Sequence, residues 1–198
     1  MGQNNPLIEM TYAWIYYANM LSKDKCEKIL KTANNSWKKA TVLGDQDDSL
    51  TVAVPGVSRY DKIERSAEVV FVKETWLLEE LFSLLNYANN ECQWNFIING
   101  IEDVQITKYN VGDFYNYHTD GNGVTTNDEG LTRKLSMSII LNDDYEGGEF
   151  EIWGDNMPIK YKTGTVILFP SYFVHKVNPI TKGIRYSLVA WFGGPKFQ

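Results

Sequence analysis

The sequence is poor in several informative kinds of residue and segment, and each shortage narrows the class of protein. It has two cysteines, Cys26 and Cys92, in distant segments with helical patterns, so we expect two buried, reduced thiols. No apolar run approaches the length needed to cross a bilayer. The opening stretch MGQNNPLIEM has neither the basic nor the apolar segment of a signal peptide. We therefore expect a soluble, cytoplasmic protein without a membrane partner.

Basic charge is also scarce. The 19 Lys and Arg residues are outnumbered by 25 Asp and Glu residues, the formal net charge is −6, and no basic run stands out. Nucleic-acid binding normally requires a basic patch, so we expect no nucleic-acid partner. The chain is 43% hydrophobic and 14% aromatic, which is typical of a globular protein. Its length predicts a single domain over residues 1–198, as a monomer or a homodimer.

Residues 1–100 predict a support region of helices and strands for the rest of the chain. Apolar spacing favours helices at 23–33, where Ser22 is a candidate N-cap, and at 74–90. Aromatic or β-prone stretches at 11–20 and 37–43 predict strands. The polar stretch 44–59 is rich in Gly, Asp and Pro, and together with 121–130 we expect it to form mobile loops beside any site.

Residues 101–197 have a different texture, because short β-prone runs alternate with turn residues. Such spacing favours a β-sandwich or barrel, so we predict a mainly β (α+β) fold with a jelly-roll core and N-terminal helices packed outside it. Gly147–Gly148 is a turn signal between two of the runs. The expected strands span 104–109, 114–118, 131–141, 149–153, 158–161, 165–169, 174–179 and 183–192.

The most informative stretch is YNVGDFYNYHTD, residues 109–120. On a strand, His118 and Asp120 would point to the same face, because residues two apart do so. The only other histidine is His175. If His175 returns to the same point, two imidazoles and one carboxylate form the facial triad typical of non-haem Fe(II) oxygenases. A lone His-x-Asp is more often an ordinary strand end, so the hypothesis depends on His175.

A second pattern lies ten residues after His175. Arg185, Ser187, Val189 and Trp191 share one face of a predicted strand. An arginine that points into a barrel needs an anion, and a bound dicarboxylate would supply one, with Ser187 donating to the same oxygens. On another predicted strand the small residues Ser136 and Ser138 share a face with Ile140. That face either makes room for such a ligand or is simply mixed.

These motifs together resemble the 2-oxoglutarate- and Fe(II)-dependent dioxygenases, and more narrowly their prolyl 4-hydroxylase-like branch. The resemblance rests on HTD at 118–120, RKLSMSIILNDDYEGGEF at 133–150 and HKVNPITKGIRYSLVAWFGG at 175–194, and it covers about half the chain. Many animal prolyl 4-hydroxylases carry lysine at the position of Arg185, whereas bacterial and hypoxia-type relatives carry arginine. This departure weakens a collagen-type assignment and leaves the cosubstrate unaffected.

The resemblance implies a double-stranded β-helix with catalytic Fe(II) held by His118, Asp120 and His175. It implies that Arg185 pairs with the distal carboxylate of 2-oxoglutarate, that Tyr109 contacts this cosubstrate, and that Trp191 lines the pocket. We also assign Ser187 and Ser138 to cosubstrate binding; the alternative for each is an ordinary structural residue. The implied cosubstrates are 2-oxoglutarate and O2, with ascorbate as a reductant.

Three functions compete. The first is hydroxylation of a prolyl or similar residue in a peptide or protein, with release of succinate and CO2. The second is the same chemistry on a free amino acid or small metabolite. The third is a cupin-like metal-binding jelly roll without turnover, which an inward Arg185 argues against. A nucleic-acid demethylase, a fourth possibility, is disfavoured by the acidic charge.

Arg59 and Arg133 are candidate substrate contacts, but we expect both to be solvated surface residues.

Overall fold

The computed structural model describes residues 12–34, 36–40, 65–121, 127, 130–153 and 161–197. The expected loop at 44–59, including Arg59, lies outside these ranges, as does most of the loop at 121–130 and of the strand expected at 158–161. The prediction that these two loops are mobile therefore stays a prediction.

The described part of the chain contains two helices followed, in the main, by short strands. The helices are α1 (Lys23–Lys31) and α2 (Thr75–Glu91). The strands are β1 (Ile15–Tyr17), β2 (Lys38–Lys39), β3 (Arg65–Ser66), β4 (Glu68–Val72), β5 (Gly100–Ile101), β6 (Val104–Tyr109), β7 (Phe114–His118), β8 (Thr132–Ile140), β9 (Glu146–Gly147), β10 (Phe150–Ile152), β11 (Val166–Pro170), β12 (His175–Val177), β13 (Ile180–Lys182) and β14 (Arg185–Gly194).

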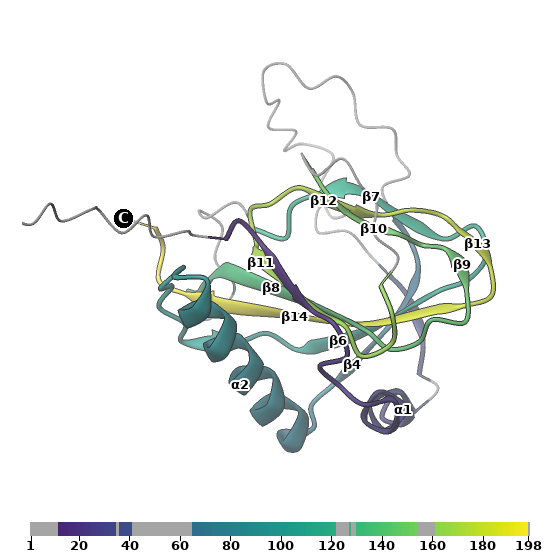
Figure 1. Cartoon of the computed structure of the whole chain (residues 1–198), viewed down its shortest axis with the longest axis horizontal. Coiled ribbons are helices and arrows are strands. Elements are labelled where there is room, and N and C mark those ends of the chain that lie inside the picture. The colour runs from purple at the N-terminus through teal and green to yellow at the C-terminus, as the bar shows by residue number, and fades with distance from the viewer. Residues whose placement is uncertain are drawn as a thin grey trace, which may run out of the picture.

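The strands form three antiparallel sheets within the described residues. The large sheet has the order β1-β11-β8-β14-β6-β4-β2, with β5 also paired to β14. A smaller sheet has the order β10-β12-β7-β3, and β13 pairs with β9. The smaller sheets lie across from the large one, while both helices cover its other side (Figure 1). This arrangement confirms the predicted mainly β, jelly-roll architecture with helices packed outside.

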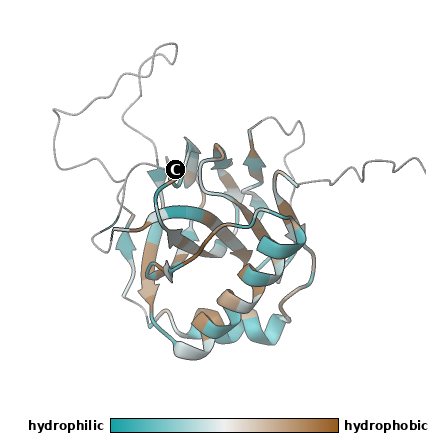
Figure 2. Cartoon of the chain, turned by 90° about the vertical axis from the view of Figure 1, so that its left-hand side faces the viewer, coloured by the Kyte–Doolittle hydropathy of each residue, from teal (hydrophilic) through white to brown (hydrophobic). Residues whose placement is uncertain are grey.

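The helices form where their apolar spacing predicts. The Ser22 hydroxyl accepts a bond of 3.2 Å from the Lys25 amide, which confirms the predicted N-cap of α1. Buried residues of both helices share one apolar cluster with residues of β6, β8, β11 and β14. Along the helices the colours of Figure 2 alternate between hydrophilic and hydrophobic, as expected for one buried and one exposed face. Cys26 and Cys92 are buried, free thiols, as predicted.

Some boundaries differ from the sequence predictions. The strand expected at 11–20 is present only as β1, and the described part of the strand expected at 37–43 contains only β2. β4 lies in a stretch to which no element was assigned, although its sequence EVVFV is strongly β-prone. β4 buries Val69, Val70 and Val72 beside β6, so tertiary pairing uses this segment as a full member of the large sheet.

Candidate metal and cosubstrate site

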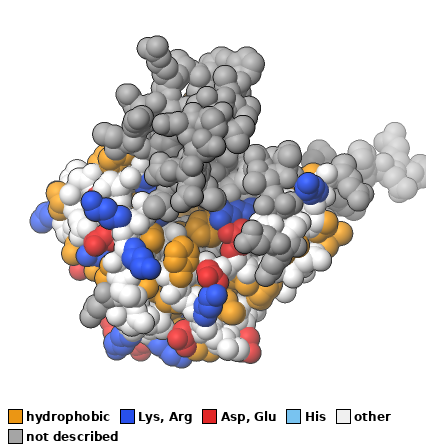
Figure 3. Space-filling view, turned by 180° about the vertical axis from the view of Figure 1, so that it is seen from behind, with side chains coloured by type: hydrophobic (Ala, Val, Ile, Leu, Met, Phe, Trp, Pro, Cys, Tyr) orange, Lys and Arg blue, Asp and Glu red, His pale blue; other side chains and the backbone are white. Residues whose placement is uncertain are grey.

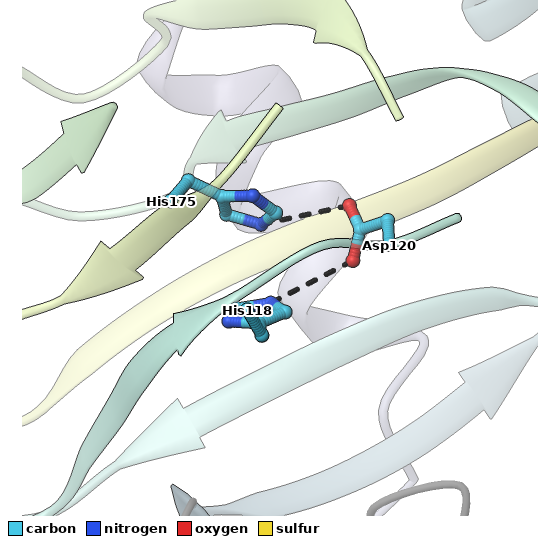
Figure 4. A group of neighbouring side chains, drawn as sticks. All are labelled: His118, Asp120 and His175. Carbon is cyan, nitrogen blue, oxygen red and sulfur yellow. Dashed lines mark ion pairs between the residues drawn. The ribbon is translucent and has the colours of Figure 1, made fainter. Parts of the chain in front are cut away.

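His118 and His175 meet because their strands pair. β7 and β12 run antiparallel with His118 opposite His175, and the two ring centroids are 4.1 Å apart. Asp120 lies two residues beyond the end of β7. Its carboxylate oxygens are 3.7 Å from Nε2 of His118 and 3.6 Å from Nε2 of His175 (Figure 4). The return of His175 to the His-x-Asp motif, on which the hypothesis depended, is therefore observed.

Backbone carbonyls fix the orientation of both imidazoles. Nδ1 of His118 lies 2.8 Å from the Asn116 carbonyl oxygen, and Nδ1 of His175 lies 2.9 Å from that of Phe173. A carbonyl oxygen only accepts, so each Nδ1 carries the proton and donates. In the neutral rings, both Nε2 lone pairs then face the Asp120 carboxylate. This is the arrangement in which histidines hold a metal ion while a backbone group fixes the tautomer.

The charges of the three groups also favour a cation between them. Burial lowers the pKa of His175 to about 4, which the Asp120 carboxylate only partly offsets, so this imidazole is neutral near pH 7. Burial acts to raise the pKa of Asp120, but His175 and His118 outweigh it and hold that pKa well below its usual range. Within the described part of the chain, the buried Oδ2 of Asp120 has no hydrogen-bond donor.

The donor set therefore fits a metal ion. One carboxylate and two imidazole nitrogens, with all three ligand atoms within 4.8 Å of one another, form the only such cluster found among the described residues. Two histidines and one carboxylate on one side of a metal, with positions left open on the other, are typical of non-haem Fe(II). Aromatic rings hold the histidines in place: Tyr115 stacks on His118 at a centroid distance of 3.4 Å, and Phe169 lies 4.6 Å from His175.

Arg185 supplies an uncompensated buried cation beside the triad. It begins β14, is 1% exposed, and its Nη1 donates to the Ser187 hydroxyl over 2.9 Å. Nε and Nη2 are buried without a partner, and no carboxylate of the described residues forms an ion pair with this guanidinium. The guanidinium carbon lies 5.3 Å from the centre of the Tyr109 ring. Burying a charge without a partner is costly, so Arg185 calls for an anionic ligand.

All eight residues predicted for the site line one pocket: His118, Asp120, His175, Arg185, Tyr109, Ser187, Ser138 and Trp191. The structure thus brings them together, and their individual roles stay predictions. The three residues expected on one face of β8 do share it but differ in their contacts. Ser138 lines the pocket, the Ser136 hydroxyl bonds Ser171 over 2.9 Å, and Ile140 packs in the apolar cluster that contains Tyr109.

The two glycines at 147 and 148 do more than mark a turn. Both adopt positive φ, at 75° and 67°, in the left-handed region that favours glycine. A Cβ on Gly148 would lie 3.0 Å from Cδ of Arg185 and would collide with Ile180. Gly148 therefore leaves space for the aliphatic part of the Arg185 side chain. In this way the Gly147–Gly148 turn helps to place the buried cation.

Several pocket residues were not predicted from the sequence. Arg65 on β3 lines the pocket with its guanidinium carbon 4.6 Å from the Tyr115 ring centre, and Gln105 donates to Thr107 over 2.7 Å. Gln105 lies four residues before Tyr109 on β6, so the two-residue period could have placed it on the same face. No pattern in the sequence before Arg65 indicates that it lies near His118.

The expectation that Arg133 is a solvated surface residue is wrong. Its guanidinium makes a bidentate ion pair with Glu102, donates to the Asp120 carbonyl oxygen over 3.0 Å, and stacks 4.2 Å from the Trp191 ring centre. Its side chain is 19% exposed. The sequence could not show this, because the partners come from three other segments.

Comparison with known proteins agrees with the fold and the site. Residues 104–193 match the model of the 2OG-Fe(II) oxygenase superfamily. Among its relatives is a PKHD-type hydroxylase of Synechococcus sp. (strain JA-2-3B'a(2-13)), which is 34% identical over 95 residues. The match covers 46% of this chain and 42% of that relative, so the chain matches less than half the length of the curated relatives.

Solved prolyl hydroxylases share the fold over nearly the whole chain. The viral collagen prolyl hydroxylase of Paramecium bursaria Chlorella virus-1 aligns over 92% of this chain and 97% of its own, with a TM-score of 0.68 and 18% identity. The Trichoplax adhaerens prolyl hydroxylase, solved with a hypoxia inducible factor peptide fragment, aligns over 91% and 83%, with a TM-score of 0.65 and 18% identity. Such distant similarity shows a common fold, here the predicted double-stranded β-helix.

Proposed function

We propose that the protein is an Fe(II)- and 2-oxoglutarate-dependent dioxygenase that hydroxylates a prolyl residue in a peptide or protein. One observation carries the proposal: a buried guanidinium with unpaired N–H groups shares a pocket with a two-histidine, one-carboxylate cluster. A structural barrel has no use for either feature. Their combination suits a metal ion and a dianionic cosubstrate held side by side.

In this proposal His118, Asp120 and His175 hold the iron. Bound iron, 2-oxoglutarate and O2 together supply the oxidising chemistry that hydroxylates a C–H bond and releases succinate and CO2. The protein contributes the neutral imidazole of His175, whose Nε2 need not lose a proton to bind, the imidazole of His118 and the ionised carboxylate of Asp120. The carbonyls of Asn116 and Phe173 keep both rings turned toward the metal position.

Arg185 binds and orients the cosubstrate. Its free Nε and Nη2 can meet the carboxylate remote from the metal, while Ser187 and Tyr109 complete the contact. A carboxylate in this nearly solvent-free setting receives charge-assisted bonds that are stronger than those at a surface. Ser138 and Trp191 are assigned to the walls of this subsite.

We propose a peptide substrate because of the proteins that this chain resembles. Its relatives include hydroxylases of the PKHD type, and its fold matches prolyl hydroxylases, one of them solved with a peptide fragment. On the face shown in Figure 3, acidic, basic and hydrophobic side chains of the described residues are interspersed, and neither sign of charge dominates that face.

Three further proposals concern the setting of the enzyme. Ascorbate is proposed as the reductant that keeps the iron ferrous. A cytoplasmic location is supported by the two free, buried thiols, since reduced cysteines are typical of reducing compartments. Residues 1–198 are proposed to act as one domain, as a monomer or a homodimer. No helix in the described part of the chain is long and apolar enough to cross a membrane.

A succinate-release screen tests the function. Purified protein is incubated with Fe(II), 2-oxoglutarate, O2 and ascorbate, with proline-containing peptides in one arm and free amino acids in the other. We expect substrate-dependent succinate release, and a mass increase of one oxygen, with peptides alone. Release with free amino acids alone would transfer the activity to a small metabolite. No 2-oxoglutarate consumption under any condition would favour the non-catalytic jelly roll.

A further inference from the structure

Asp120 has no strand to hold it. β7 ends at His118, so Thr119 and Asp120 lie outside the hydrogen-bonded ladder that positions the two histidines. A metal ligand in a loop needs other contacts, because a functional group must be held within a fraction of an ångström to bind productively. The chain supplies these contacts to the backbone on both sides of the Asp120 side chain.

On one side, Arg133 contacts the Asp120 backbone. Nη1 of Arg133 donates to the Asp120 carbonyl oxygen over 3.0 Å. Its Nε and Nη2 donate to the two carboxylate oxygens of Glu102 over 2.8 and 2.5 Å, a bidentate pair that fixes the plane of the guanidinium. Trp191 packs against the flat face of the same group at 4.2 Å. Arg133 therefore has little freedom to release the carbonyl.

On the other side, the loop approaches β8 and β11 closely. The Gly121 amide donates to the Ser171 carbonyl oxygen over 2.9 Å. A Cβ on Gly121 would come within 3.0 Å of Cβ of Arg133 and 3.3 Å of its carbonyl oxygen, so only glycine fits without displacement. The residue after the ligand is thus pressed against the backbone of Arg133, the residue whose side chain binds the ligand's carbonyl.

Glu102, which anchors Arg133, is itself held by the large sheet. It lies between β5 and β6, and its amide donates to the Trp191 carbonyl oxygen of β14 over 2.9 Å. The two residues that contact the Arg133 guanidinium, Glu102 and Trp191, are therefore joined to each other by a backbone hydrogen bond. Arg133 itself is not among the described residues that line the pocket, so it reaches the site through other groups.

We propose that Arg133, fixed by Glu102, is a positioning residue that sets the place of the Asp120 carboxylate relative to the two histidines. The proposal rests on the proposed metal site. Without the Arg133 contact, the loop after His118 samples arrangements in which the carboxylate is displaced, and the third ligand binds the metal less well. Partners that orient metal ligands in this way typically change metal affinity about 10- to 100-fold when removed.

The test is Co(II) binding to metal-free protein, without 2-oxoglutarate or peptide, followed by the visible d–d absorbance of the bound ion. We expect Arg133→Leu to weaken Co(II) affinity about 10- to 100-fold and to alter the shape of the spectrum. Arg133→Lys should lose less, since one ammonium retains one of the two contacts. Glu102→Gln, which keeps Arg133 but loosens its anchor, should also lose less.

Lys108→Met is the matched control. Lys108 forms a similarly half-buried ion pair, 2.7 Å from Glu68, on the same sheet but without contact to Asp120. Thermal unfolding monitored by circular dichroism confirms that each variant is folded at the titration temperature. Lys108→Met should bind Co(II) as the wild type does even if its melting temperature falls.

The outcomes are distinguishable. Wild-type protein that fails to bind Co(II), or binds it equally well as Asp120→Ala, would remove the proposed metal site itself. Wild-type binding that depends on Asp120, together with unchanged affinity and spectrum in both Arg133→Leu and Glu102→Gln, would overturn the positioning role alone. An Arg133→Leu variant with unchanged Co(II) binding but a raised KM for peptide would show instead that Arg133 contacts the substrate.

Discussion

The two faces of the large sheet are both buried, yet they differ in chemistry. On β14, Leu188, Ala190 and Phe192 face the helices and are fully buried in the apolar cluster. The alternate residues Arg185, Ser187, Val189 and Trp191 line the pocket. β8 shows the same division: Leu135 and Ile139 lie in the apolar cluster with the helices, while Ser136 and Ser138 face inward.

Burial alone therefore does not identify a structural core. One face of the strand is covered by apolar side chains. On the other face, some buried polar atoms have no hydrogen-bond partner among the described residues. The helix-facing side contributes stability, whereas unpaired polar groups on the pocket side oppose it. We therefore expect substitutions on the two faces to separate stability from ligand binding.

The largest separation should come from Asp120→Ala. Turnover of 2-oxoglutarate should become undetectable and metal affinity should collapse, because one of the three ligands is lost. The metal-free protein should remain folded, because the substitution keeps the backbone contact of residue 120 with Arg133, and the buried Oδ2 of Asp120 has no hydrogen-bond partner among the described residues. Succinate release, Co(II) titration and thermal melting measure these effects. The control is Asp103→Ala, an exposed carboxylate paired with Lys73. Full activity in Asp120→Ala would refute the ligand assignment.

The next effect concerns the cosubstrate. Losing one partner of a buried charge pair costs about 3–5 kcal/mol, so Arg185→Ala should raise the apparent KM for 2-oxoglutarate by about 10²–10³ or more. Metal affinity should change little, because Arg185 is not a ligand. Arg185→Lys should be milder, since one ammonium still meets one carboxylate, yet weaker than wild type. Anaerobic titration with 2-oxoglutarate in the presence of Fe(II) checks both variants. Wild-type affinity in Arg185→Ala would place the carboxylate elsewhere.

Neighbouring residues on β14 test the two faces directly. Leu188 is completely buried on the helix side, so Leu188→Ala should lower the free energy of unfolding by about 2–5 kcal/mol. Ser187→Ala removes one hydrogen bond to Arg185 and should cost only about 1 kcal/mol.

The effects on the KM for 2-oxoglutarate should be the reverse of the effects on stability. Ser187→Ala should raise the KM for 2-oxoglutarate, and Leu188→Ala should leave it unchanged while the protein is folded. Urea denaturation and steady-state kinetics on both variants provide the comparison. Equal losses of stability with equal changes in KM would show that the two faces are not separable.

The smallest expected effect lies in the partly exposed pair of Glu68 on β4 with Lys108 on β6. The hydrogen bond from Lys108, followed by that from Asn110, lowers the pKa of Glu68 below its ordinary value. A lowered pKa means that the stabilisation is present above the unfolded pKa near 4.5 and is lost as the pH falls through the folded pKa.

The pair is partly exposed, so the effect should be at most about 1 kcal/mol. In urea denaturation between pH 7 and pH 3, Glu68→Gln should lose less stability on acidification than the wild type. An identical pH dependence in the two proteins would show that the pair contributes nothing measurable.

The sequence predicted much of this site because strands have a strict two-residue period. That period correctly placed Arg185, Ser187, Val189 and Trp191 on one face. It fails on β7, where both Tyr115 and His118 line the pocket although an odd spacing should separate them. The register shifts opposite these residues, between His175 and Val177, so an irregularity turns both side chains inward.

Local features could be predicted from the sequence: two amphipathic helices, the short strands after residue 100, and a His-x-Asp motif with a distant histidine and arginine. These follow from periodicity and residue type, which act over a few positions. Only the tertiary structure decided that β4 joins the large sheet, and that Arg133 binds Glu102, Trp191 and the Asp120 backbone. His118 and Asp120 do converge, although Asp120 lies beyond the strand. Contacts between segments far apart in the chain fix its position, and no local pattern encodes them.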